Sequence, residues 1–433
     1  MPYFLGLDFG TSGARAIAID SDHQICCEIA IPFPVVPVEQ QPTLWKRTLF
    51  SLISQVPASI RSHLNALAID GTSSTVLICD RQGQPLHPPL MYNDAIGATP
   101  QLNQLGTIAQ QILQIAPTGH CVHSSSSSLA KLLWLSQQVD LSLAQAFVHQ
   151  ADWLGFWLHG HLGVSDYHNS LKLGYDPALQ DYPVWFDHPT LNPLQRLLPQ
   201  VVAPGTRIGH PTPDISAALG LPPTCALCAG TTDSIAAFLA SGASRPGEAV
   251  TSLGSTLVIK LLSQQRIDQA EYGIYSHRLG NHWLVGGASN TGGAVLAEYF
   301  SPAELQAFSA LINPHQPSPW HYYPLLKPGE RFPINDPHLM PCLTPRPDDP
   351  VAFLHGLLES IAGIEALGYA RLVELGATPP SQIYTAGGGA QNQTWEIIRH
   401  RHLGVPLLRP QFPQAAYGTA LLALQQTAIS ELV

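Results

Sequence analysis

The stretch DFGTSGAR (8–15) joins two apolar segments, and its residue types are the first indication of the fold of the chain. The surrounding stretch, YFLGLDFGTSGARAIAID (3–20), predicts two β-strands connected by a tight turn. Such a turn needs glycine for its backbone, but it needs no carboxylate, hydroxyl or guanidinium group. Those groups, together with exposed backbone N–H groups, hold phosphates and their metal ions. The candidate phosphate-binding residues are Asp8, Thr11, Ser12, Gly13 and Arg15. Alone, the stretch fits an ordinary polar hairpin equally well.

Length and composition restrict the class of protein. With 433 residues, 45% of them hydrophobic, the chain predicts two domains with sizeable cores. The net charge of −10 and the absence of a basic run argue against a nucleic-acid partner. The N-terminus resembles no signal peptide, and no apolar run is expected to span a membrane. Seven cysteines, an odd number, favour a reducing compartment. We therefore expect a soluble cytoplasmic protein without a membrane partner.

Strand and helix patterns alternate along the chain, which favours an α/β architecture. Helical spacing predicts helices over 43–56, 101–115, 351–376 and 415–427. A second hairpin is expected over 76–90, and a polar loop over 165–177.

A second informative segment is AGTTDS, at 229–234, where a buried strand leads into an apolar helix. An aspartate at a helix N-terminus is often only a cap. Asp233, however, also follows the carboxyl end of a strand, where α/β sheets place their chemistry. Both interpretations remain open on these residues alone.

The opening pattern recurs about 245 residues later. EAVTSLGSTLVIKLL (248–262) is again a strand, a Gly-Ser-Thr turn and a strand, which suggests a duplicated domain. Farther on, TAGGGAQN (385–392) places three glycines between a strand and a helix. The chain contains neither GxxxxGK[ST] nor GxGxxG, so a P-loop or a Rossmann site has no support. Two facing hairpins could instead hold a polyphosphate through backbone N–H groups.

These motifs together resemble the FGGY family of carbohydrate kinases. DFGTSGAR resembles the family's first phosphate motif, SLGST (252–256) its second, and GGGAQN (387–392) its adenosine motif. SLAKLLWL (128–135) and HGLLESIAGIEALGYARL (355–372) resemble its two signature regions. The resemblance covers nearly the whole chain, with the motifs in the right order. It implies two ribonuclease-H-like (actin-like ATPase) domains with a nucleotide cleft between them.

The same resemblance implies the domain boundaries. Residues 1–240 match the sugar-binding N-terminal domain, which the final helix (414–433) rejoins. Residues 241–413 match the ATP-binding C-terminal domain.

The resemblance also assigns roles to individual residues. Asp233 matches the general base, and Asp8 the carboxylate that positions Mg²⁺ and lies beside the substrate. The ATP-binding positions are Thr11, Ser12, Gly13, Arg15, Gly254, Ser255, Thr256, Gly388, Gly389, Asn392 and Trp395. The sugar-binding positions are Asp8, Ser73, Ser74, Asp94 and Asp233.

The stretch DGTSST (70–75) most resembles ribulokinase-type members. We therefore expect ATP-dependent phosphorylation of a ketopentose, D-ribulose first, with ATP and Mg²⁺ as cofactors. D-Xylulose is the alternative substrate. An actin-like or chaperone-type ATPase, or a sugar-binding protein with vestigial kinase activity, is the alternative of another class. The sequence does not indicate the oligomeric state.

Overall fold

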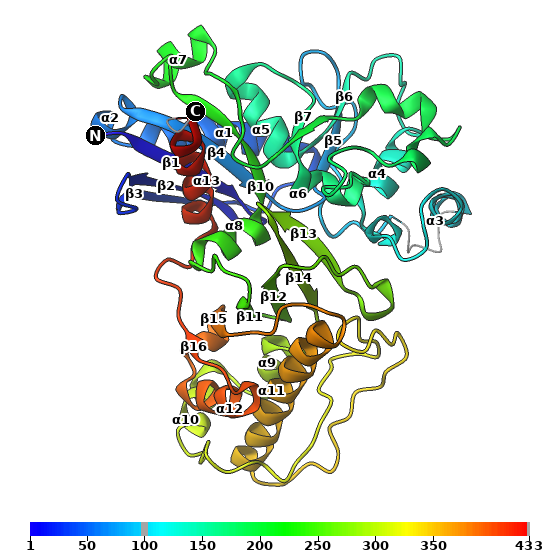
Figure 1. Ribbon diagram of the computed structural model, residues 1–433, viewed down its shortest axis with the longest axis vertical. Coiled ribbons are helices and arrows are strands. Elements are labelled where there is room, and N and C mark those ends of the chain that lie inside the picture. Colours follow the sequence, from blue (N-terminus) through cyan, green and yellow to red (C-terminus); the bar gives the residue numbers. More distant parts are fainter. Residues whose placement is uncertain (97–102, 431–433) are drawn as a thin grey trace. The chain divides into compact units, whose positions relative to one another are not determined.

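The computed structural model describes residues 1–96 and 103–430, which form two compact units. Unit 1 contains Met1–Ala240 and Phe412–Val433, and unit 2 contains Ser241–Gln411. Each unit is built on a six-stranded mixed sheet (Figure 1).

The sheet of unit 1 grows from the opening hairpin. Its strand order is β3-β2-β1-β4-β10-β9, with β1 antiparallel to β2 and parallel to β4. Tight turns join β1 to β2 and β2 to β3, whereas helical segments separate the parallel strands β1, β4 and β10. The bounds are β1 Tyr3–Phe9, β2 Gly13–Asp20, β3 Ile25–Pro32, β4 Leu64–Gly71, β9 Arg207–Gly209 and β10 Ala226–Thr232.

Helices cover both faces of this sheet. On one face, Leu5, Leu7 and Phe9 pack with Trp45 of α1 (Gln41–Gln55) and Trp153 of α5 (Gln150–His159). The opposite face is buried by the C-terminal helix α13 (Ala415–Ser430), which returns to β1 and also lies against α8 (Asp233–Ala240) (Figure 1). The approach is close, since a Cβ on Gly418 of α13 would lie 1.9 Å from the carbonyl oxygen of Ala236.

Unit 1 carries a further layer of smaller elements beside the sheet. β5 pairs with β6, and β7 pairs with β8. A second hydrophobic core lies among α3, α4 and the 3₁₀ turns of this region. The bounds are α2 Ala58–Arg61, β5 Val76–Cys79, α3 Asn103–Ile115, α4 Ser128–Leu135, β6 Ala146–His149, β7 Val164–Asp166, α6 Tyr167–Ser170, β8 Gln200–Val202 and α7 Pro213–Leu219.

One prediction of local structure is wrong in this layer, and another is confirmed only in part. Residues 165–177 are not a loop, because the Asp166 side chain accepts hydrogen bonds from the backbone N–H groups of His168 and Asn169 and caps the short helix α6. The predicted hairpin over 76–90 is confirmed only in part: its turn forms at Asp80–Gln84 and its two arms are joined by antiparallel bridges, but they do not form a regular two-stranded ladder. β5 instead pairs with β6, and only single bridges connect it to Pro85 and Leu90. Residues 101–102 of the predicted 101–115 helix lie outside the described part of the chain.

The sheet of unit 2 repeats the plan of unit 1. Its order is β13-β14-β12-β11-β15-β16, with β11 antiparallel to β12 and parallel to β15. The strands β3-β2-β1-β4-β10 of unit 1 correspond to β14-β12-β11-β15-β16 of unit 2. In both sheets an antiparallel neighbour comes first, then the two strands of the hairpin, then two strands that run parallel to the hairpin's inner strand. The bounds are β11 Glu248–Leu253, β12 Leu257–Ser263, β13 Tyr275–Leu279, β14 His282–Ala288, α9 Gly293–Tyr299, α10 Pro302–Ser309, α11 Pro350–Glu374, β15 Gln382–Ala386, α12 Gln393–Leu403 and β16 Leu407–Leu408.

The long helix α11 forms the core of unit 2. By length and hydropathy it could cross a membrane, contrary to the expectation that no segment is long and apolar enough. Its most apolar window is 61% buried within the fold, where Phe353 and Leu357 face one hydrophobic cluster and Tyr369 and Leu372 another. This burial is typical of the core helix of a globular domain.

Candidate active site

Three carboxylates occupy one edge of the sheet in unit 1. β1, β4 and β10 are parallel neighbours, with Asp8 beside Asp70 and Thr231 beside Asp70 in the register. Asp233 follows β10 directly as the first residue of α8. The carboxyl ends of three adjacent parallel strands thus bring Asp8, Asp70 and Asp233 to the same edge, which is where open α/β sheets bind ligands.

Asp70 is the member of this group that the sequence analysis missed as a site residue. It is fully buried, and burial together with the charge of Asp8 raises its pKa well above the usual range. The hydroxyl of Thr419 on α13 donates a hydrogen bond to one oxygen of Asp70. Because 349 residues separate the two side chains, no local pattern indicated the contact. The raised pKa favours the protonated acid, which leaves Asp8 and Asp233 as the carboxylates available for chemistry.

Asp8 is less buried than Asp70 and keeps access to the edge of the sheet. Burial raises its pKa, while interactions with Asp70 and Arg15 act in the opposite direction. Arg15 lies opposite Asp8 in the hairpin register. Its guanidinium donates to Glu28 on β3 at 2.8 Å, so part of the positive charge predicted for a phosphate is already paired. Both partners are about one-third exposed or more, so this pair is weak and replaceable.

The hairpin turn itself presents small polar residues to solvent. Thr11 and Ser12 are exposed, and the N–H of Gly10 donates to the carbonyl of Gly13 at 3.0 Å. A Cβ on Gly13 would lie 2.8 Å from the carbonyl oxygen of Ile31, so the neighbouring strand β3 requires glycine there. The turn therefore offers accessible hydroxyl and N–H groups, as the phosphate interpretation requires.

The predicted sugar residues lie on two segments that pack together. Ser73 is half-buried, whereas Ser74 is buried with a left-handed backbone (φ 63°), and its Oγ has no partner among the described residues. Asp94 accepts a hydrogen bond from the backbone N–H of Met91 at 2.7 Å. Of the two serines, Ser73 is thus the more accessible to a ligand.

Unit 2 contains a large pocket at the ends of β11 and β15. Its volume is about 1000 Å³, at the upper end of the range for small-molecule sites. The pocket brings together predicted ATP-binding residues that are more than 130 positions apart in the sequence: Gly254, Ser255, Gly388, Gly389, Asn392 and Trp395. Thr256 follows in the same turn but does not line the pocket.

The glycine-rich loop has the backbone that a close ligand approach needs. Gly387 adopts φ 85°, and a Cβ on it would lie 2.6 Å from the carbonyl oxygen of Leu253. Gly388 faces open space, with no atom within 4 Å of a Cβ position. Both the conformation and the free space permit a flat ligand to lie against this backbone.

Asn392 and Trp395 have structural roles that the sequence did not predict. The Asn392 side chain caps α12 by accepting from the N–H of Trp395 at 3.0 Å, and its Nδ2 donates to Ser309 at 2.8 Å. Trp395 is only 2% exposed and packs beneath Gly389, where a Cβ would approach the indole to 2.6 Å. These residues support the floor of the pocket.

The opposite wall of the pocket was not predicted. It comes from α9 and α10, whose residues Gly293, Ala297 and Gln306 face the cavity. The start of α9 is fixed to the phosphate turn, since the N–H of Gly293 donates to the carbonyl of Gly254 at 2.8 Å. The sequence does place a loop of small residues before α9. Its role in the pocket depends on its contact with the turn at Gly254, which the sequence alone does not indicate.

A buried ion pair lies beneath this pocket and connects the strands that form it. Arg399 of α12 donates to Glu365 of α11 at 2.6 Å and to Thr385 of β15 at 2.8 Å. Thr251 of β11 donates to the same carboxylate at 2.6 Å. The network thus connects β11 and β15, whose ends carry the two glycine turns.

The residues at the acidic edge of unit 1 are compatible with a magnesium site. Mg²⁺ is usually held by one or two carboxylates together with substrate phosphates and water, rather than by a closed protein cage. Asp70 has an oxygen that is buried and unpartnered among the described residues, and Asp8 lies beside it in the register. Within the described part of the chain, no three His, Cys, Asp or Glu side chains are grouped as a metal cage. The position of Asp8 is thus compatible with the prediction that it holds Mg²⁺.

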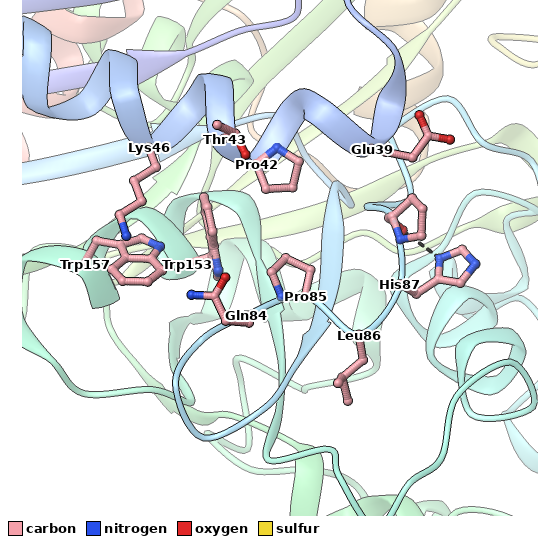
Figure 2. A pocket seen from close by; sticks show the side chains of 11 residues that line it. Glu39, Pro42, Thr43, Lys46, Gln84, Pro85, Leu86, His87, Trp153 and Trp157 are labelled. Carbon is pink, nitrogen blue, oxygen red and sulfur yellow. Dashed lines mark hydrogen bonds between the residues drawn. The ribbon is translucent and has the colours of Figure 1, made fainter.

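A separate hollow of about 320 Å³ lies elsewhere in unit 1 (Figure 2). It is formed by α1, the 84–88 loop and α5, and it contains none of the predicted site residues. Figure 2 shows Lys46 beside Trp157, with the ammonium 3.0 Å from the centre of the ring. This contact engages the Lys46 ammonium, and Glu39 is the one carboxylate among the lining residues, whereas the edge of the sheet brings three carboxylates together.

The duplicated hairpin-based sheet, the carboxylates at one sheet edge and the glycine-lined pocket define the class as an actin-like ATPase fold of two domains. Two family models match the chain, the N-terminal domain of the FGGY carbohydrate kinases at residues 3–240 and the C-terminal domain at residues 249–426. The chain belongs to the FGGY family of carbohydrate kinases.

Curated relatives and solved structures agree with this assignment. The chain is 22% identical to a xylulose kinase of Bacillus subtilis, over 98% of this chain and 88% of that protein. It is 27% identical to a ribulokinase of Geobacillus thermodenitrificans, over 61% of this chain and 53% of that protein. A crystal structure described as a xyloylose kinase from Brucella ovis superposes with a TM-score of 0.86 at 22% identity, covering 98% of this chain and 90% of that one. Likeness at this identity establishes the fold.

Proposed function

We propose that the protein transfers the γ-phosphoryl group of ATP to a hydroxyl of a ketopentose, with D-ribulose as the preferred substrate and D-ribulose 5-phosphate as the product. The observation that carries this proposal is the grouping of Asp8, Asp70 and Asp233 at the carboxyl ends of three parallel strands. Family membership supports ATP as the phosphoryl donor. We assign the sugar to unit 1, residues 1–240 with 412–433, and the nucleotide to unit 2.

In this proposal Asp233 is the general base. Its carboxylate accepts the proton of the attacking sugar hydroxyl, the hydroxyl oxygen forms a bond to the γ-phosphorus, and the bond from that phosphorus to the β,γ-bridging oxygen breaks to release ADP. A base of this kind supplies a factor of about 10² to 10⁴ in rate. Ser73, Ser74 and Asp94 position the sugar, with the accessible Ser73 making the more direct contact.

The nucleotide is assigned to the two glycine turns and the pocket between them in unit 2. Backbone N–H groups at Gly254, Ser255 and Thr256 bind phosphate oxygens, and the loop at Gly388 and Gly389 receives the adenosine. Thr11, Ser12, Gly13 and Arg15 supply the corresponding phosphate contacts from unit 1. Mg²⁺ held by Asp8 would neutralise charge on the phosphate oxygens, which phosphoryl transfer requires more than covalent assistance.

The choice of sugar rests on the segment DGTSST (70–75). Its hydroxyl-rich sequence resembles ribulokinase-type members, while several of the relatives are named xylulose kinases, so D-xylulose is the second candidate. One relative is named a gluconokinase, so D-gluconate is included among the sugars to be tested. The seven cysteines are all free thiols, which supports the cytoplasm as the proposed compartment.

A panel assay tests the proposal. ADP release with Mg-ATP is measured in the presence of D-ribulose, D-xylulose, D-gluconate, glycerol and aldopentoses. We expect D-ribulose to give the highest kcat/KM. A higher value for D-xylulose would transfer the assignment to the second candidate, and no stimulation by any sugar would refute the kinase proposal.

A further inference from the structure

The two predicted sugar segments are joined by a buried lysine that no part of the phosphoryl-transfer chemistry uses. Lys131 lies on α4 and is fully buried. Its ammonium donates to the carbonyl oxygen of Ser74 at 2.8 Å and to that of Met91 at 2.7 Å. One acceptor belongs to the segment that carries Ser73, and the other lies three residues before Asp94.

Burying an ammonium group is expensive unless its hydrogen bonds compensate for the lost water. Burial lowers the pKa of Lys131 to about 7, with Asp94 acting to raise it and Lys172 to lower it further. A methionine of similar length would fill the same space without this cost. The role of the ammonium is therefore to donate hydrogen bonds to the two carbonyl groups, and it is not needed for the packing of α4.

The conformation at Ser74 shows what the lysine maintains. A left-handed backbone is unfavourable for serine and persists only where the surroundings impose it. The Ser74 Oγ has no partner among the described residues, so its side chain does not stabilise that conformation. The backbone N–H of Thr75 closes this turn by donating to the carbonyl of Thr72 at 3.2 Å, and the hydrogen bond from Lys131 to the Ser74 carbonyl restrains the same turn from α4.

A second contact joins the same two segments. The backbone N–H of Tyr92 donates to Oγ1 of Thr75 at 3.0 Å, and Thr75 is fully buried. Thr75 also lies 2.5 Å, oxygen to oxygen, from the hydroxyl of Thr72, which is bonded to Gln150 of α5. These two side-chain links add to the backbone hydrogen bonds between Val76 and Leu90, both 3.0 Å long, and together they set the spacing between Ser73 and Asp94.

We propose that Lys131 is a positioning residue for the sugar, because its ammonium holds the Ser73–Ser74 turn and the Met91–Asp94 turn at the separation that a short-chain ketose requires. The inference rests on the proposed function, since it presumes that these turns contact the acceptor. It concerns sugar affinity and selectivity, and it assigns Lys131 no contact with ATP.

The test compares Lys131→Met with Lys46→Met, which removes a half-buried lysine from the same unit outside these turns. We expect Lys131→Met to raise KM for the sugar about tenfold or more while KM for ATP changes less than about twofold, because a lost charged hydrogen bond has an effect of this size. Lys46→Met should leave both KM values near those of the wild type. An unchanged sugar KM, or an equal rise in both KM values, in folded Lys131→Met protein would overturn the inference.

Thr75→Val provides the second variant should Lys131→Met not fold. It removes the acceptor for Tyr92 N–H and the contact with the Thr72 hydroxyl while it preserves side-chain volume, and it should also raise KM for the sugar selectively. An unchanged sugar KM in folded Thr75→Val protein would contradict the spacing role of these links. Failure of the proposed function is distinguishable, because the wild type itself would then show no sugar-dependent ADP release.

Discussion

At the scale of single residues, the question at Asp233 is whether its carboxylate only caps α8 or also acts as the catalytic base. It is the first residue of α8, and its Oδ1 accepts a hydrogen bond from the N–H of Ser234 at 2.6 Å. Any aspartate at a helix start can do this. Asp233, however, also lies at the edge of the sheet beside Asp8 and Asp70, where its charge contributes to the raised pKa of Asp70.

We predict that Asp233→Asn lowers kcat at least about 100-fold with little change in the melting temperature, because asparagine still caps the helix but accepts no proton. Steady-state kinetics and thermal unfolding measure the two effects. Asp214→Asn, in the first turn of α7, is the matched control and should keep full activity. Retention of wild-type kcat in Asp233→Asn would remove Asp233 from the mechanism.

Lys131 also makes a prediction about pH. Its pKa in the folded protein is about 7, below the value near 10.4 of an unfolded chain. The unfolded state therefore binds more protons at this site between these values, so the lysine's unfavourable contribution to the free energy of unfolding diminishes as pH rises above 7. Urea unfolding at pH 7 and pH 9 should show the wild type gaining stability relative to Lys131→Met. A difference that does not change with pH would contradict the lowered pKa.

At the scale of elements, the return of α13 to the sheet depends on small residues. Gly418 allows α13 to lie against α8, and Gly6 of β1 has the α13 backbone at a similar distance, with a Cβ position 2.0 Å from the carbonyl oxygen of Ala416. The same helix brings Thr419 to Asp70. Packing of α13 and organisation of the carboxylate edge are thus coupled.

We predict that Gly418→Ala destabilises the protein by about 2 kcal/mol or more, since overpacking against backbone cannot be relieved by a rotamer change. Gly363→Ala, within α11, meets only an ordinary contact at 3.9 Å and should be neutral or stabilising. Chemical denaturation of both variants provides the comparison. Equal stability of the two variants would show that α13 does not pack as closely as described.

The buried pair beneath the pocket of unit 2 makes another prediction. Arg399→Met leaves the Glu365 carboxylate buried without its cation, and we expect a loss of about 3–5 kcal/mol in the free energy of unfolding. Replacing both residues with methionine should cost less than the single change, because no uncompensated charge remains. Urea denaturation of the single and double variants measures both values. A double variant less stable than the single one would argue that the charges stabilise the fold beyond their mutual pairing.

At the scale of the whole molecule, the hairpin duplication was accessible from sequence because glycines and alternating apolar residues mark turns and strands locally. The elements over 165–177 were missed because a polar stretch became a helix through the Asp166 cap. Asp70 and Lys131 were missed for a different reason. Their partners lie 349 residues away in one case and 57 and 40 residues away in the other, and a lone lysine in a helix ordinarily indicates a solvated surface.

The site shows the same limit on sequence reasoning. Six predicted residues of unit 2 line one pocket, because five belong to glycine motifs at the ends of strands and Trp395 follows one of these motifs in α12. The wall formed by α9 and α10 had no such motif. The ion pair of Arg15 with Glu28 and the cap formed by Asn392 depend on contacts that only the folded chain reveals.

The central claim is that the phosphoryl group is transferred to a sugar and not to water. Phosphorus NMR of a reaction containing the protein, Mg-ATP and D-ribulose tests it directly. The account predicts a sugar phosphomonoester formed in equal amount with ADP, and its loss in Asp233→Asn. Accumulation of ADP and inorganic phosphate without a sugar ester would contradict it, and would favour an actin-like ATPase.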